Sequence, residues 1–221
     1  MNNKEKGKLI KDLMVESLED AYNAQLKKSS LKSAKFVECF GNNLYREFCE
    51  NELDSSEPKL AVQKVKDDGS GKQSGEWLLD IVIKKEFEIA DPDKKQSKAN
   101  LVKDVLWAIE SESSTSIKEM AKDFGKLVVI NAENYVYLNG VDQKTIENVN
   151  AYIKRRIETV EDIMDKIGER FIGKNLYYGF WPKPGSSNWS ENYWDNLSIK
   201  DLKSRIKLFE LSEEEMKLEE I

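Results

Sequence analysis

The segment VLWAIESESST, residues 105–115, combines the two features that decide how this chain folds. It begins with five consecutive apolar residues, which is typical of a buried β-strand. Glu110 and Glu112 then follow two residues apart, and residues at that spacing in a strand point to the same face of a sheet. Ionised carboxylates resist burial. The segment therefore predicts either a solvated strand end or acidic side chains that share a cation.

The composition fits a soluble globular chain. The 221 residues suit a single domain spanning 1–221, with 34% charged and 39% hydrophobic residues. No apolar run is long enough to span a bilayer, and the first residues lack the apolar core of a signal peptide, so we expect a cytoplasmic protein with no membrane partner. Cys39 and Cys49 lie on one expected helix, roughly 15 Å apart along its axis, which excludes a disulfide between them.

The chain contains no histidine. This absence excludes Ser-His-Asp hydrolysis, Cys-His proteases and HExxH metalloenzymes. Because there are only two cysteines, which are far apart, we expect no zinc site. If the protein is an enzyme, the catalytic groups that remain are carboxylates, lysines and a hard cation such as Mg²⁺. The net charge of -6 argues against a wholly basic nucleic-acid binder but permits a local basic groove.

Hydrophobic periodicity predicts a mixed α+β fold. In chain order, the patterns predict helices at 4–26 and 30–51, antiparallel strands at 59–67, 76–89 and 100–112, a short helix at 116–124, strands at 126–131 and 134–140, and a long helix at 143–169. An aromatic segment follows, and the chain ends in a short helix and an acidic tail that we expect to fray.

Asp80 interrupts the apolar sequence LLDIVI. An unpaired ionised carboxylate in such a strand costs several kcal/mol, so Asp80 requires a cation, a lysine or a backbone amide as its partner. If its strand pairs with the strand that carries Glu110 and Glu112, the three carboxylates meet at one end of the sheet. Such a group of hard oxygens suits one or two Mg²⁺ ions, which activate water and stabilise charge on a phosphodiester.

The expected elements follow a particular order: an Asp, then a Glu-x-Glu that ends the next strand, then a helix and a further strand. This order resembles the PD-(D/E)xK nuclease superfamily, which includes many type II restriction endonucleases. The resemblance covers residues 31–138 and implies a restriction-endonuclease-like αβββαβ core, a mixed sheet flanked by helices. Extra helical elements would precede and follow this core, and residues 139–221 would form an extension with the long helix and the aromatic segment.

The resemblance also implies roles for individual residues. Asp80 and Glu110 occupy the two acidic positions, and Glu112 stands where the family usually has a lysine. In some family members the lysine comes from the following helix, a place that Lys118 or Lys122 would fill here. Exposure in the first turns of that helix explains these lysines equally well.

The family often places a further acidic residue on the helix that precedes the sheet. Glu38 is the matching residue here, although it also fits an ordinary surface position. The expected metal ligands are therefore Asp80, Glu110, Glu112 and Glu38. The expected activity is Mg²⁺-dependent hydrolysis of duplex DNA, of restriction type, with Mn²⁺ able to replace Mg²⁺.

Basic and aromatic residues provide candidate nucleic-acid contacts. The long helix carries Lys154, Arg155 and Arg156 together, and Trp181 and Lys183 follow in the aromatic segment. A solvated helix face explains the first group equally well, and a hydrophobic core explains the rings. The regular apolar spacing of the long helix fits either a homodimer contact or packing on its own sheet.

Two other functions remain open. A catalytically inactive member of the same fold would bind DNA or a protein partner. This alternative is favoured because position 112 carries a glutamate where the family usually has a lysine. An unrelated α+β interaction protein would use the aromatic C-terminal third as its binding surface.

Overall fold

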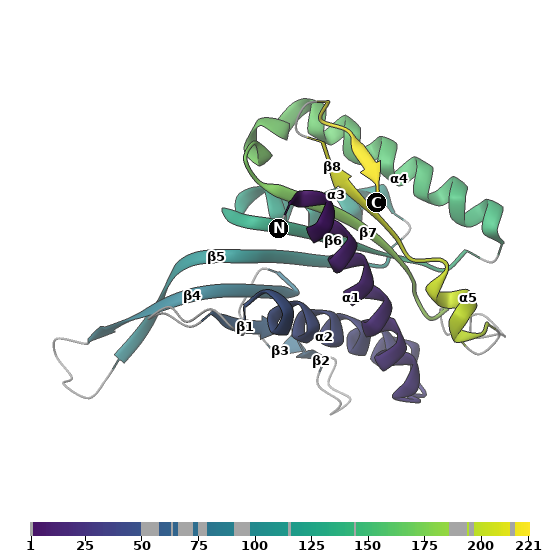
Figure 1. Ribbon diagram of the computed structural model, residues 1–221, viewed down its shortest axis with the longest axis horizontal. Coiled ribbons are helices and arrows are strands. Elements are labelled where there is room, and N and C mark those ends of the chain that lie inside the picture. The colour runs from purple at the N-terminus through teal and green to yellow at the C-terminus, as the bar shows by residue number, and fades with distance from the viewer. Residues whose placement is uncertain are drawn as a thin grey trace.

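The computed structural model describes residues 2–49, 58–62, 64–65, 73–74, 79–90, 98–114, 116–143, 145–185, 194, 197–212 and 215–221. Its centre is a seven-stranded mixed sheet with helices on both faces (Figure 1). The prediction of an α+β fold with a mixed sheet flanked by helices is confirmed. Trp189 and Tyr193, two rings of the aromatic segment, lie outside the described residues.

The first half of the sheet is an antiparallel meander followed by a parallel crossover. Strands β1 (Lys59–Val62), β4 (Ile81–Ala90) and β5 (Lys98–Glu112) pair in that order, each antiparallel to the next. Helix α3 (Ile117–Val129) then crosses to β6 (Ala132–Val141), which is parallel to β5. A separate pair of short strands, β2 (Lys64–Val65) and β3 (Gln73–Ser74), lies between β1 and β4 in the sequence.

The second half extends the same sheet. Helix α4 (Ile146–Ile167) and a 3₁₀ turn (Gly168–Phe171) lead to β7 (Asn175–Pro182), which is parallel to β6. After α5 (Ile199–Lys203), strands β8 (Lys207–Leu211) and β9 (Leu218–Glu220) add antiparallel to the edge. The expectation of a frayed acidic tail is wrong, because Leu218 is buried and its strand pairs with β8.

One predicted strand is also wrong. Residues 126–131 were expected to form a strand, but α3 continues to Val129. Met120, Phe124 and Leu127 recur at helical spacing and are all buried on one face of α3. An apolar run of this length fits a buried helix as well as a strand, and packing against the sheet decides between them. Ser116 precedes the helix as expected, but its side chain makes no capping hydrogen bond.

Two hydrophobic cores lie on opposite faces of the sheet. Helices α1 (Asn3–Asn23) and α2 (Ser29–Phe48) pack on one face, where Ile81 and Ile109 contribute to the core. Helices α3 and α4 cover the other face, where the neighbouring residues Val82 and Ala108 point. Side chains alternate along a strand. The carboxylate of Glu110, two residues after Ala108, therefore lies on the face that α3 covers.

Two further features agree with the sequence. Cys39 and Cys49 are both buried, and they form no disulfide with each other, as their spacing predicted. Among the described residues, no helix is both long enough and apolar enough to cross a membrane.

Candidate functional site

Asp80 and Glu110 lie beside each other at the end of the β4–β5 pair. Ile81 pairs with Ile109, and continuing this register by one residue places Asp80 opposite Glu110. The backbone N–H of Asp80 donates to Glu110 Oε2 at 3.3 Å, and the N–H of Ser111 donates to Asp80 Oδ2 at 2.8 Å. These reciprocal bonds between backbone and carboxylate fix the side chain of Asp80, the residue just before β4, beside that of Glu110 on β5. Glu110 is buried, with 2% of its surface exposed.

Lys126 completes this group from helix α3. Its Nζ forms an ion pair with Glu110 Oε1 and a second one, at 2.7 Å, with Asp123 Oδ1. Asp123 and Lys126 are one helical turn apart, so both project toward the strand ends. The sequence prediction did not include either residue. The only local signal was their i, i+3 spacing on the face that also carries Met120 and Phe124.

Burial raises the pKa of both strand carboxylates. For Glu110, burial and then the negative charge of Asp80 raise the pKa to about 8, against the opposing effect of Lys126. Burial also raises the pKa of Asp80. For Lys126, burial opposes the charged form, but the ion pairs with Asp123 and Glu110 outweigh it and raise the pKa of the ammonium. The site therefore favours the charged form of Lys126 and disfavours ionisation of both Asp80 and Glu110 at the same time.

Glu112 has different hydrogen-bond partners from Glu110. Its Oε1 accepts hydrogen bonds from the backbone N–H groups of Ser113, at 2.5 Å, and Ser114. Burial raises the pKa of Glu112, and its hydrogen bond with Asp123 raises it further. Burial opposes ionisation of Asp123 as well, but hydrogen bonds from Glu112 and Lys126 outweigh that effect and lower its pKa. Of this pair, Glu112 therefore keeps its proton to a higher pH than Asp123 does.

The arrangement limits which residues can hold a metal ion. Asp80 and Glu110 are adjacent and present hard oxygens, whereas Glu112 is engaged by the turn that follows it. In the part of the chain that the structure describes, no group of three or more His, Cys, Asp or Glu side chains is placed to hold a metal ion. A cation at this site would thus have two carboxylates of the described residues as ligands, and other oxygens would complete its coordination.

Three of the predicted site residues lie elsewhere. Glu38 is on α2, which packs on the opposite face of the sheet, and it pairs with Lys35 at 3.1 Å. Lys118 is exposed, and Lys122 is exposed and lies 3.7 Å from Glu119. The structure does not bring either lysine to Glu110, because both precede Lys126 on the helix and point to solvent. Lys126 occupies the place that was assigned to them.

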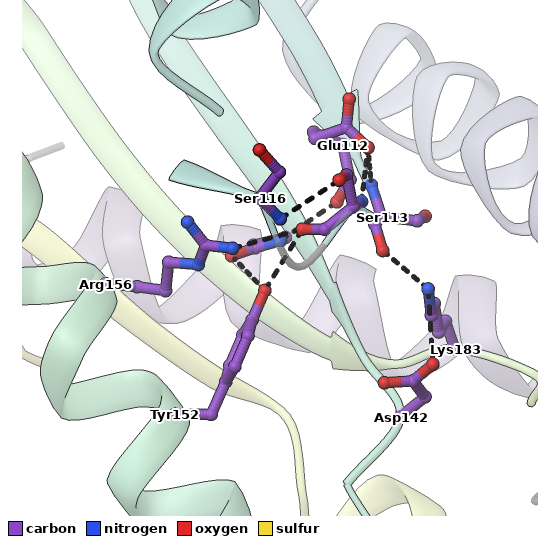
Figure 2. Close-up of polar contacts among 9 residues, drawn as sticks. Glu112, Ser113, Ser116, Asp142, Tyr152, Arg156 and Lys183 are labelled. Atoms are coloured by element: carbon purple, nitrogen blue, oxygen red, sulfur yellow. Dashed lines mark hydrogen bonds and ion pairs between the residues drawn. The ribbon is translucent and has the colours of Figure 1, made fainter. Parts of the chain in front are cut away.

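The turn after Glu112 is held by side chains from α4 and β6. Asn139 Nδ2 donates to the carbonyl oxygen of Glu112 at 3.0 Å, and Asn139 Oδ1 accepts from the hydroxyls of Tyr152 and Tyr178. Arg156 donates to the carbonyl oxygen of Ser114 at 3.1 Å. Figure 2 shows Tyr152 and Arg156 reaching from α4 toward this turn, with Lys183 on its other side.

The predicted nucleic-acid contacts divide into three groups. Lys154 and Arg155 are exposed on α4, whereas Arg156 is buried. Lys183 is half-buried and donates to the carbonyl oxygen of Ser113 at 2.5 Å while lying 3.4 Å from Asp142.

Trp181, a predicted nucleic-acid contact, lies in the hydrophobic core. The residue is 1% exposed, and its ring stacks on Phe36 with centroids 4.1 Å apart. It packs in the core beneath α1 and α2 because a ring of this size gains more from burial there than from solvent.

Comparisons with protein-family models, with curated proteins and with solved structures find no match for this chain. The geometry of the site is therefore the basis for assigning a function.

Proposed function

We propose that this protein is a Mg²⁺-dependent endonuclease of the PD-(D/E)xK type that hydrolyses phosphodiester bonds in duplex DNA. The observation that carries the proposal is the hydrogen-bonded contact of Asp80, just before β4, with Glu110 on the neighbouring strand β5, with Lys126 in contact with Glu110. Two acidic residues and a lysine at this position are the residue types that the resemblance requires. The chain order of α2, β1, β4, β5, α3 and β6 also supports it, apart from the small β2–β3 pair.

The two carboxylates fit a hard divalent cation. Proteins usually hold Mg²⁺ through one or two carboxylates, while waters and substrate phosphates complete its coordination. Asp80 and Glu110 would hold the ion, and their raised pKa values support this role because a nearby cation offsets the cost of ionising both. When bound, Mg²⁺ would supply a water of lowered pKa and would stabilise negative charge on the phosphate.

The chain's own residues would position and neutralise the substrate. Lys126 keeps a positive charge beside Glu110, because its ion pairs with Glu110 and Asp123 raise its pKa. It would therefore stabilise developing negative charge or donate a proton, and would not act as a base. Asp123 holds the ammonium group in place at 2.7 Å.

A second candidate function is a non-catalytic module of the same fold that binds DNA or a protein partner. One observation favours it: the Glu112 carboxylate is engaged by backbone N–H groups and by Asp123, so it adds no ligand to the Asp80–Glu110 pair. Such a protein would bind its partner with no dependence on a divalent ion.

Nicking of supercoiled plasmid DNA tests the proposal, first with Mg²⁺ and then with Mn²⁺. The wild type should cut, and Asp80→Asn and Lys126→Met should not, because each removes a charge at the centre. Lys122→Met, a change on the same helix at an exposed position, is the matched control and should cut normally. If the wild type cuts nothing with either ion, and neither ion raises its melting temperature, the non-catalytic module becomes the better description.

A further inference from the structure

The guanidinium group of Arg156 is buried, and no acidic side chain of the described residues forms an ion pair with it. The residue is 3% exposed, on the face of α4 that packs toward the sheet. Its hydrogen bonds run to the carbonyl oxygen of Ser114 and, at 3.3 Å, to the sulfur of Met120, which is a weak acceptor. Within the described ranges, neither Arg156 nor the neighbouring Arg155 forms an ion pair with a carboxylate.

Such an arrangement needs an explanation, because a buried charge is costly unless it is paired. A guanidinium group has five N–H donors in a planar fork, and the two acceptors of Arg156 leave most of that capacity unused. The face of the Tyr152 ring, 5.0 Å from the guanidinium carbon, adds a cation–π contact, which offsets part of the cost of burial but supplies no negative charge. The site therefore has a positive charge in excess.

A cavity of about 180 Å³ lies at this point. Among the described residues, its lining includes Ile117, Gln143, Tyr152, Arg155 and Arg156. Pockets that bury a whole drug-sized ligand measure roughly 300–1,000 Å³, so this cavity suits one small group. Two guanidinium groups and a side-chain amide offer hydrogen-bond donors to it, whereas the hydroxyl proton of Tyr152 is donated to Asn139. An oxyanion is the chemistry that these donors match.

We propose that this cavity, defined by these five residues and named the α4 pocket, binds a phosphate group. Arginine forks bind phosphate oxygens in pairs, which gives both charge and geometry. Binding of phosphate itself requires no catalytic centre. The assignment of that phosphate to a nucleic-acid strand rests on the proposed function.

The position of the α4 pocket supports that assignment. Arg156 contacts Ser114, two residues after Glu112, and Tyr152 contacts Asn139, which binds the carbonyl oxygen of Glu112 (Figure 2). The turn after Glu112 therefore links the α4 pocket to the carboxylates. A strand whose phosphate occupied the α4 pocket would be held close to the Asp80–Glu110 pair.

Calorimetric titration with inorganic phosphate in the presence of EDTA tests the α4 pocket without metal or catalysis. The wild type should bind phosphate, and Arg155→Gln should weaken binding about tenfold or more, as expected for the loss of a charge-assisted hydrogen bond. Arg156→Lys should also weaken it, because lysine keeps the charge and loses the fork. Lys154→Gln changes the adjacent exposed cation and should bind as the wild type does. Equal binding by the wild type, Arg155→Gln and Arg156→Lys, or no binding by the wild type, would overturn the proposal.

Two short DNA duplexes, one with 5′-phosphates and one without, distinguish the source of the phosphate. If the α4 pocket binds a terminal phosphate, only the duplex with 5′-phosphates should compete with inorganic phosphate for it. If the α4 pocket binds an internal phosphate, both duplexes should compete. Arg155→Gln should then reduce the slope of log K for duplex binding against log salt concentration by about 0.9. If neither competes, the α4 pocket holds a free phosphate and its assignment to nucleic acid is wrong. Asp80→Asn should bind phosphate normally, so failure of cleavage and failure of the α4 pocket are separate results.

Discussion

Lys126 on α3 forms an ion pair with Glu110 on β5, 16 residues earlier in the chain. The crossover from β5 to the parallel strand β6 makes this contact, because it returns α3 across the face on which Glu110 lies. The side chain of Glu110 is 3% exposed and that of Lys126 is 26% exposed. The carboxylate is therefore enclosed by the protein while its cationic partner still reaches solvent, where a substrate phosphate would approach.

Replacing Lys126 by methionine should reduce Mg²⁺-dependent cleavage about 100-fold or more, the scale of losing a positioned acid or charge. The change keeps the length of the side chain and removes its charge. It should also destabilise the protein more at pH 8.5 than at pH 5.5, because Glu110 can protonate at the lower pH when its partner is absent.

Measurements of cleavage rate and urea denaturation at both pH values check this prediction. Lys118→Met is the control on the same helix, since Lys118 is exposed. Equal losses of activity for Lys118→Met and Lys126→Met would show that the ion pair has no special role.

Asp80→Asn should stabilise the metal-free protein. Asparagine retains an oxygen that accepts from the N–H of Ser111, and the backbone N–H that donates to Glu110 is unchanged. The change removes the negative charge that helps raise the pKa of Glu110, and relief of this repulsion is worth on the order of 1 kcal/mol. Thermal denaturation in EDTA measures the effect, and Mg²⁺ should then raise the melting temperature of the wild type alone. A lower melting temperature for Asp80→Asn in EDTA would contradict this account.

The stability of the metal-free protein should fall as the pH rises from about 5 to about 8. The folded-state pKa of Glu110 is raised from 4.5 to about 8, so the folded protein retains a proton that the unfolded chain has lost. The stabilising contribution of this group is complete below pH 4.5 and is lost as the pH passes through 8. The raised pKa of Asp80 acts in the same direction, and that of Lys126 has its effect only above about pH 10.

Urea denaturation at intervals of pH checks this dependence, with Glu110→Gln as the comparison. The glutamine variant should show a flatter profile between pH 5 and 8. Parallel profiles for the two proteins would mean that Glu110 ionises normally.

Trp181 should prove to be a core residue and not a DNA contact. Trp181→Ala should lower the free energy of unfolding by about 3–5 kcal/mol, as for other large rings removed from cores. Trp181→Phe should keep the stacking on Phe36 and should remove an indole N–H that has no hydrogen-bond partner among the described residues. It should therefore fold stably and bind duplex DNA with unchanged affinity, which a mobility-shift titration would measure. Weaker binding by well-folded Trp181→Phe would restore the original assignment.

Local patterns accounted for much of the fold. The apolar runs that surround Asp80 and precede Glu110 predicted two neighbouring strands with carboxylates at one end, and these strands pair antiparallel. The same patterns could not identify residues 126–129 as helix, because four apolar-rich residues fit a strand or a helix turn equally well. The tertiary contact of Leu127 with the sheet decides it.

The candidate site was predictable only in part. Strand periodicity placed Glu110 and Glu112 on one face, but it could not show that Glu112 would turn to the N–H groups of the residues after it. The choice of Lys126 over Lys118 or Lys122 depends on how far α3 continues and on its rotation over the sheet. Neither quantity is encoded within one helical turn of sequence.

Glu112→Gln should retain most of the cleavage activity, in contrast to Glu110→Gln. The oxygen of a glutamine side chain can accept from the N–H groups of Ser113 and Ser114, and its amide can donate to Asp123. The fold and the position of Lys126 should therefore persist, with activity within about threefold of the wild type, since the change preserves volume and hydrogen bonding.

At Glu110 the same substitution removes an ion pair with Lys126 and a proposed metal ligand, so cleavage should fall by about 100-fold or more. Single-turnover cleavage rates with saturating Mg²⁺ separate the two cases. Equal loss in both variants would make Glu112 a third ligand that turns toward the ion when it binds.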